Sequence, residues 1–208
     1  ILSPVNSQSI AILSLNSISS GKSFLCNLIS IFISRFIYMK KQDSILIFGS
    51  SGQIGKSLIR KFTKNNYRVI AVTRSIHRKG YQIKTQSNYG YLELEEINSF
   101  SEENISKLME KSTICINLIG ILYEKKKNQF NLIHTELPSL LSSVASKKLI
   151  DQFIHISALG IEAATDSKYA SSKLNGEKKV RQNFPRSVVL KPSIVYSVDD
   201  NFTTKIYE

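Results

Sequence analysis

The sequence has no tryptophan and only two cysteines, Cys26 and Cys115, which lie far apart. They form neither a CxxC pair nor any metal-ligand spacing, so a disulfide framework and a zinc ribbon are excluded and a reducing compartment is favoured. Glycine and proline are too few for a collagen-like or low-complexity chain. Acidic residues are also scarce, 16 against 28 Lys and Arg, which leaves a net charge of +12 on 208 residues. This length and composition predict one globular domain, either alone or with an additional piece.

The beginning of the chain differs in composition from the rest. No acidic residue precedes Asp43, and residues 24–38 form an apolar run interrupted by Arg35. This run is shorter than the roughly 20 residues that span a bilayer. We therefore separate a leader, residues 1–38, from a domain at 39–208. Three interpretations stay open for the leader: a non-native or removed segment before a start at Met39, a mitochondrial transit segment, or an interfacial membrane anchor.

A glycine motif follows the first predicted strand. Residues 44–48 are a short apolar, β-branched run, and Leu58, Ile59 and Phe62 then recur at helical spacing. Between the run and the helix, three glycines have the spacing G-x-x-G-x-x-G. Such a turn gives a tight bend, close approach of the backbone to a pyrophosphate and close helix–strand packing, with the helix N–H groups facing the phosphates. The predicted dinucleotide-binding segment comprises Gly49, Ser50, Ser51, Gly52, Gln53, Ile54 and Gly55.

The next predicted strand, residues 67–74, ends in Arg74 and is followed by Ser75. An acidic residue at this position accepts hydrogen bonds from the ribose 2′-hydroxyl of NAD, whereas an arginine suits the 2′-phosphate of NADP. The sequence therefore favours NADP(H), with NAD(H) as the alternative cofactor. The other interpretation of Arg74 and the basic residues after it is a set of solvated loop charges.

The remaining pattern alternates strands with helices, as a parallel α/β sheet requires. Pro138 is expected to kink the long helical stretch or to mark a first turn. These elements predict a Rossmann-type, doubly wound parallel sheet of order 3-2-1-4-5-6, with ligands at the carboxyl ends of the strands. Further strands are predicted near residues 90–93, 113–118, 152–157 and 187–193, and helices near 56–66, 102–111, 130–147 and 167–184.

Tyr169 and Lys173 stand four residues apart on a predicted helix, so both side chains lie on one face. A nearby ammonium is expected to lower the phenol pKa and make the tyrosine a usable acid or base. Tyr123 and Lys127 have the same spacing, which we interpret as a chance match. Only Tyr169 follows the fifth strand, where the nicotinamide is expected.

Several motifs together resemble the short-chain dehydrogenase/reductase superfamily in its extended or atypical branch. These motifs are GSSGQIG, NLIG at 117–120, HISALG at 155–160, YASSK at 169–173 and LKPSIVY at 190–196. The ordered series from 44 to 201 is most similar to the NAD(P)-binding accessory subunits of respiratory complex I and their α-proteobacterial relatives. The resemblance implies a Rossmann fold, bound NADP(H), a structural role beside the quinone region, and a substrate-covering region that continues beyond this chain.

The resemblance also implies roles for particular residues. Tyr169 and Lys173 would meet the nicotinamide ribose, and Ser157 or the inert Ala158 would stand where active reductases hold the substrate oxygen. Which of the two occupies that place depends on a one-residue shift. The adenosine side would be lined by Asn117, Leu118, Ile119 and Gly120, and the nicotinamide would lie near Pro192 and Ile194.

Two functions from different classes follow. The first is an NADP(H)-binding accessory or assembly component of an NADH:quinone oxidoreductase, holding the nucleotide as a structural ligand among respiratory-complex subunits. The second is an active NAD(P)-dependent reductase, epimerase or dehydratase that uses Tyr169 and Lys173. The location would be the cytoplasmic face of the inner membrane in a bacterium or the mitochondrial matrix side in a eukaryote.

Neither the excess of basic residues nor the histidines are assigned a catalytic role. Most lysine clusters are interpreted as solvated faces, with an acidic partner or peripheral contact with an anionic lipid surface as the sharper alternative. No nucleic-acid module is recognised. His134 and His155 are assigned to the interior, with no catalytic role.

Overall fold

A computed structural model describes residues 11–12, 43–164, 166–193 and 195. The predicted leader, apart from residues 11–12, and Ile194 therefore lie outside the described residues, as does Cys26. Cys115 is a buried free cysteine, and burial raises the pKa of its thiol. Within the described ranges, no helix combines the length and the apolar character needed to cross a membrane.

The described strands form one parallel sheet in the order β1-β7-β6-β5-β2-β3-β4. Without the short β1, this is the predicted order 3-2-1-4-5-6. The strands are β1 (Ala11–Ile12), β2 (Ser44–Phe48), β3 (Arg68–Thr73), β4 (Leu92–Glu96), β5 (Ile114–Asn117), β6 (Gln152–Ile156) and β7 (Val188–Lys191).

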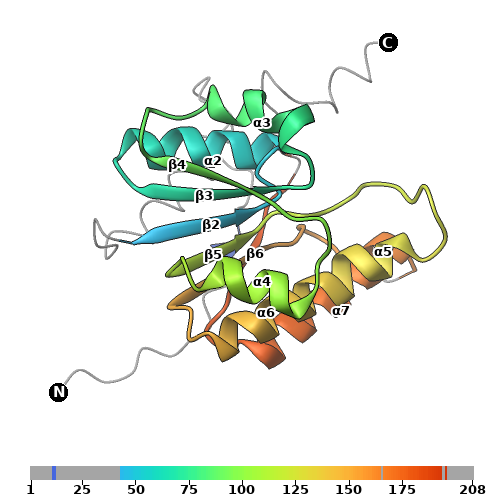
Figure 1. Ribbon diagram of the computed structural model, residues 1–208. Coiled ribbons are helices and arrows are strands. Elements are labelled where there is room, and N and C mark those ends of the chain that lie inside the picture. The colour runs from blue at the N-terminus through green and yellow to red at the C-terminus, as the bar shows by residue number, and fades with distance from the viewer. Residues whose placement is uncertain (1–10, 13–42, 165, 194, 196–208) are drawn as a thin grey trace, which may run out of the picture.

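Helices cover both faces of the sheet, with α2 and α3 on one side and α4, α6 and α7 on the other (Figure 1). Because both faces are covered, the central strands are apolar throughout, and every residue of β2 is buried. The helical elements are α2 (Gln53–Lys64), α3 (Ile76–Lys84), α4 (Glu102–Met109), α5 (Gln129–Asn131), the π-helix η1 (Leu132–Glu136), α6 (Leu137–Lys147) and α7 (Lys168–Asn183).

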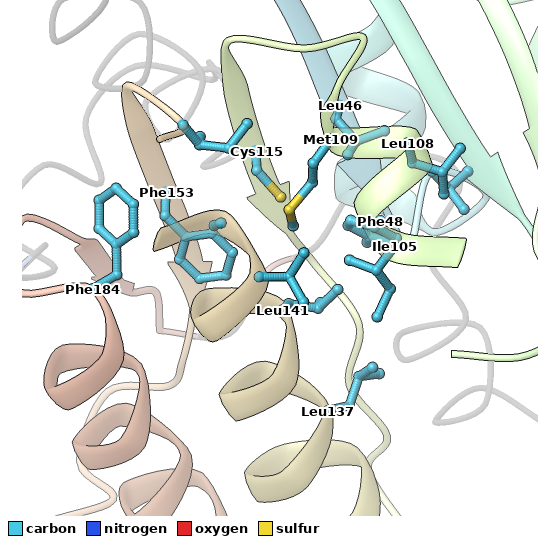
Figure 2. Packing of buried hydrophobic residues seen from close by; sticks show 14 of the residues in the cluster. Leu46, Phe48, Ile105, Leu108, Met109, Cys115, Leu137, Leu141, Phe153 and Phe184 are labelled. Carbon is cyan, nitrogen blue, oxygen red and sulfur yellow. The ribbon is translucent and has the colours of Figure 1, made fainter. Parts of the chain in front are cut away.

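The core divides into two layers, one on each face of the sheet. On the α2 face, Leu58, Ile59 and Phe62 are the helical residues that pack on the strands. On the other face, Cys115 and Phe153 project from β5 and β6 toward α4 and α6 (Figure 2). Helix α7 contributes Val180 to this layer, and Phe184, directly after the helix, also belongs to it.

Two local expectations, on a strand and on a loop, need correction. The strand expected at 90–93 lies at Leu92–Glu96, so Glu96 reaches the carboxyl edge of the sheet beside Thr73. The basic residues after Arg74 belong to α3, not to a loop, because Ser75 caps a helix whose Gly80 and Ile83 are buried. Pro138 lies in the first turn of α6, directly after the π-helix, which confirms the first-turn alternative expected for it.

Candidate functional site

The glycine turn joins β2 to α2. Gly49 has φ +82°, a backbone conformation that side chains disfavour, and the Gly52 N–H donates to its carbonyl oxygen at 3.1 Å. A Cβ at Gly55 would lie 2.6 Å from the carbonyl oxygens of Gly49 and Ser50. The Ser50 hydroxyl donates to the Val72 carbonyl at 2.7 Å, which fastens the turn to β3. The turn is therefore rigid, and glycine is required at its first and last positions.

The start of α2 suits an anion. The N-cap residue is Gly52, no side chain caps the helix, and its first turn carries no acidic residue. The adjacent Ser51 hydroxyl lies 3.4 Å from the Lys79 ammonium, which donates to it from α3. Uncapped N–H groups, the helix dipole and a neighbouring cation together stabilise phosphate oxygens. These residues therefore fit a dinucleotide pyrophosphate.

The carboxyl ends of β3 and β4 carry opposite charges. Arg74 is exposed directly after β3. The Ser75 hydroxyl accepts the Arg78 N–H at 3.4 Å, and the Glu96 carboxylate accepts the Ile76 N–H at 2.8 Å. Glu96 was not predicted as a site residue, because the strand was expected to end at residue 93. The available signal was the alternation of leucine and glutamate, which continues past residue 93 to Glu95.

The segment after β5 packs against the glycine turn and α7. Asn117 is fully buried; its Oδ1 accepts the Ile119 N–H, and its Nδ2 lies 3.1 Å from His155 Nδ1. Its side chain therefore holds the segment in shape. Leu118 and Ile119 are half-buried, and Gly120 is exposed. A Cβ at Gly120 would lie 3.3 Å from Lys173 Nζ, so this segment passes close to the lysine.

Tyr169 and Lys173 lie on α7 as predicted. Lys173 is buried, its Nζ donates to the Ile156 carbonyl at 3.2 Å, and burial lowers its pKa to about 8. The Tyr169 ring lies edge-on to the rings of Phe130 and His134, and burial raises its pKa. The expected lowering of the phenol pKa by Lys173 is therefore wrong for this arrangement, because desolvation of the phenolate dominates.

His134 connects the segment after β5 to helix α7. It is buried on the π-helix, and its Nε2 accepts the Ile121 N–H at 3.1 Å. Its Nδ1 lies 3.0 Å from the Ser172 hydroxyl, which donates to the Tyr169 carbonyl at 2.8 Å. Since Nε2 is an acceptor, we place the ring proton on Nδ1. Both His134 and His155 are interior, as expected; the contact from His134 to the segment after β5 was not foreseen.

The remaining predicted residues are placed as follows. Ser157 is buried after β6 with no hydrogen-bond partner for its hydroxyl among the described residues, whereas Ala158 is half-buried. The Pro192 carbonyl accepts the Leu159 N–H at 2.9 Å, which joins the ends of β6 and β7. Tyr123 and Lys127 are exposed and lie outside any helix, so the same-face argument does not apply to them.

The parallel topology brings the glycine turn, the segment after β5, Ser157 and Pro192 to one edge of the sheet. Lys173 joins them through its bond to β6 and its proximity to Gly120. Arg74 and Glu96 lie at the same edge: Arg74 follows β3, which neighbours β2, and Glu96 ends β4, one strand further. This is the edge at which ligands bind in open α/β sheets.

Comparison with known proteins gives a consistent picture. The model of the NmrA-like family matches residues 41–184. The chain is 26% identical to the mouse "NADH dehydrogenase [ubiquinone] 1 alpha subcomplex subunit 9, mitochondrial", covering 75% of this chain and 41% of that protein. It is 21% identical to a ceramide reductase of Caulobacter vibrioides, covering 79% of this chain and 50% of that protein. The chain thus spans half or less of these relatives.

Among solved structures, a UDP-glucuronic acid 4-epimerase from Bacillus cereus, crystallised with NAD, superposes with a TM-score of 0.61. The two share 22% identity, and the match covers 74% of this chain and 57% of the epimerase. This likeness establishes the doubly wound fold.

Proposed function

The chain belongs to the NmrA-like family, and from this premise we propose that it binds a nicotinamide dinucleotide along the carboxyl edge of its sheet. We further propose that it serves as an accessory or assembly component of a complex I-like NADH:quinone oxidoreductase, with the nucleotide as a structural ligand. The observation that carries the binding is the rigid glycine turn against the uncapped start of α2. The mouse relative, named as a subunit of such an enzyme, supports the assembly role.

Each part of the nucleotide has a proposed place. The pyrophosphate lies on the turn from Gly49 to Gly55, and the adenosine side lies along 117–120. The nicotinamide ribose meets Tyr169 and Lys173, and the nicotinamide lies near Pro192 and Ile194. Lys173 offers a buried, preoriented ammonium for ribose hydroxyls.

NADP(H) is the favoured cofactor. Arg74 extends into solvent after β3, and a guanidinium can bind a 2′-phosphate through two parallel hydrogen bonds. Lys79, beside Ser51, adds a second cation near the phosphates. NAD(H) is the alternative.

A structural role places no catalytic demand on the Tyr169 phenol, whose pKa is raised by burial. A ligand that binds only the native state at a hundredfold excess over Kd stabilises it by about 2.7 kcal/mol, with no chemistry required.

The assembly role implies respiratory-complex subunits as partners. In a eukaryote the protein would lie on the matrix side of the inner mitochondrial membrane, and in a bacterium on the cytoplasmic face. The net charge of +12 is compatible with peripheral contact to an anionic lipid surface.

The test is to isolate the full-length protein from its own cells and assay it for released nucleotide and comigration with a respiratory complex. We expect nucleotide to copurify, and Tyr169→Phe to leave both properties intact. Tyr123→Phe, at an exposed tyrosine, is the matched control. A protein that carries no nucleotide and migrates alone would contradict the proposal.

The second candidate is an active reductase, epimerase or dehydratase of the extended short-chain type. It is favoured by Tyr169 and Lys173 on one helix, the buried Ser157 hydroxyl, and the ceramide reductase among the relatives. Turnover of a carbonyl or sugar-nucleotide substrate that is lost in Tyr169→Phe, with nucleotide binding preserved, would establish it.

A further inference from the structure

The start of α3 is covered by a carboxylate from the neighbouring strand. Glu96, the last residue of β4, accepts the Ile76 N–H at 2.8 Å through Oε2. Residue Ile76 is the first of α3, and no acidic residue occurs in that helix's own first turn. The carboxylate therefore satisfies a helix N–H and complements the positive end of the helix dipole.

The Glu96 carboxylate lies beside the end of β3, the position where an acidic residue binds the ribose of NAD in this type of fold. Thr73 and Glu96 are register partners in the parallel pair β3–β4, so both strands end at the same level of the sheet. The chain continues from Thr73 into the exposed Arg74 and the helix cap Ser75. Arg74 and Glu96 consequently lie at the same edge of the sheet, and Glu96 contacts the start of α3.

The two charges act oppositely on a nucleotide. A 2′-phosphate carries a charge of about −1.5 to −2 at neutral pH, so Arg74 attracts it while a carboxylate repels it. A phosphate that takes the Ile76 N–H must also displace Glu96 from it. A ribose 2′-hydroxyl is instead a donor that a carboxylate accepts.

We propose that Glu96 is a specificity-determining residue. It weakens the binding of NADP(H) and strengthens the binding of NAD(H), so it reduces the preference for NADP(H) that Arg74 creates. The inference rests on the dinucleotide binding proposed above. It means that β4 supplies the acidic ribose partner that β3 lacks, and that NADP(H) is favoured by a smaller margin than Arg74 alone would give.

The test measures Kd for NADPH and NADH, by nucleotide fluorescence, on the full chain and on Glu96→Gln. The amide oxygen of Gln can still accept the Ile76 N–H, so the variant removes the charge and keeps the cap. Removing one nearby like charge at a solvent-exposed site is expected to raise the ratio of NADH Kd to NADPH Kd about tenfold. Most of the change should be tighter NADPH binding.

The matched control is Glu95→Gln. Glu95 is the preceding residue of β4, so its side chain points to the opposite face, where it pairs with Lys111 at 2.5 Å. This control should leave the ratio unchanged. Glu96→Ala, which removes the cap as well as the charge, should shift the ratio in the same direction as Glu96→Gln.

The outcomes separate this inference from the proposed function. A parent chain that binds neither nucleotide overturns both. A parent that binds nucleotide while the Glu96 variants keep its ratio within twofold overturns only the role of Glu96, as does an equal shift in Glu95→Gln.

Discussion

Helix α7 approaches the π-helix so closely that a Cβ built on Gly176 would lie 1.8 Å from the His134 carbonyl oxygen. The approach is reinforced by the Thr135 hydroxyl, which donates to the Ser172 carbonyl at 2.9 Å. Since Tyr169 and Lys173 lie on the same helix, this packing sets their position relative to the segment after β5. Gly176, which is unfavourable in a helix by propensity, is thus required by packing.

Gly176→Ala is therefore expected to destabilise the protein by about 3 kcal/mol or more, because a backbone oxygen cannot move away without shifting the helix. Denaturant unfolding followed by circular dichroism measures the loss. Gly80→Ala in α3 is the control: its Cβ would meet the Ile76 side chain at 3.0 Å, and that side chain can rotate. Comparable stability losses in both variants would contradict the packing argument.

The strand order could be predicted because it depends on strong signals: apolar β-branched runs, the glycine turn and short connections. Helix α3 was missed because basic residues after Arg74 resembled a loop, although Ser75, Gly80 and Ile83 mark a capped helix with one buried face. The error at β4 has a related cause, since an edge strand with half-buried glutamates lacks the apolar contrast that identifies central strands.

Local motifs could indicate where the candidate site residues lie in the fold, whereas the contacts among them that depend on tertiary structure were missed. Glycine spacing and the Tyr169–Lys173 pair are visible in the sequence. The contact from His134 to Ile121, and that from Glu96 to Ile76, join segments that only the fold brings together. The pKa of Tyr169 likewise follows from burial against Phe130 and His134, which spacing does not reveal.

The glycine turn should allow binding to be separated from folding. Among the described residues, a Cβ at Gly52 would meet only the Gly49 carbonyl oxygen within 4 Å, at 3.3 Å, whereas a Cβ at Gly55 would meet two backbone oxygens at 2.6 Å. Gly52→Ala should therefore keep most of the stability while reducing nucleotide affinity at least tenfold, about 1.4 kcal/mol, because the methyl group occupies the approach to α2. Gly55→Ala should unfold at markedly lower denaturant concentration.

Titration with NADPH and NADH alongside denaturant unfolding tests both variants. If Gly52→Ala binds nucleotide as the parent does, the phosphates do not lie on this turn.

Arg74→Ala should weaken the binding of NADPH much more than the binding of NADH. Loss of a guanidinium that pairs with a phosphate is expected to cost about 1.5 to 3 kcal/mol, whereas NAD(H) has no 2′-phosphate to lose. Kd values from fluorescence titration measure this. Arg68→Ala is the control, because Arg68 is an exposed arginine at the opposite end of β3, paired with Glu93 at 2.6 Å. Equal losses for the two nucleotides in Arg74→Ala would refute the phosphate contact.

The two buried histidines should make stability depend on pH below neutrality. Burial lowers the pKa of His134 to about 4 and that of His155 to about 3, from an ordinary value of 6.5. Below pH 6.5 these histidines bind protons in the unfolded chain but stay neutral in the native state. The free energy of unfolding therefore decreases as pH falls. The decrease approaches 1.4 kcal/mol per pH unit for each imidazole and ends near the native pKa values. Above pH 7 the contribution is complete.

Urea unfolding at pH 7.5, 6 and 5 measures this dependence, and His134→Gln isolates one imidazole. The amide can accept the Ile121 N–H and donate to Ser172, so the fold should persist while about half of the histidine-linked decrease between pH 6 and 5 disappears. His77→Gln, at an exposed position on α3, is the matched control variant. Because other groups titrate alike in all three proteins, the difference between the variants reports on His134 alone, and an unchanged slope in His134→Gln would show that this ring is already charged in the native state.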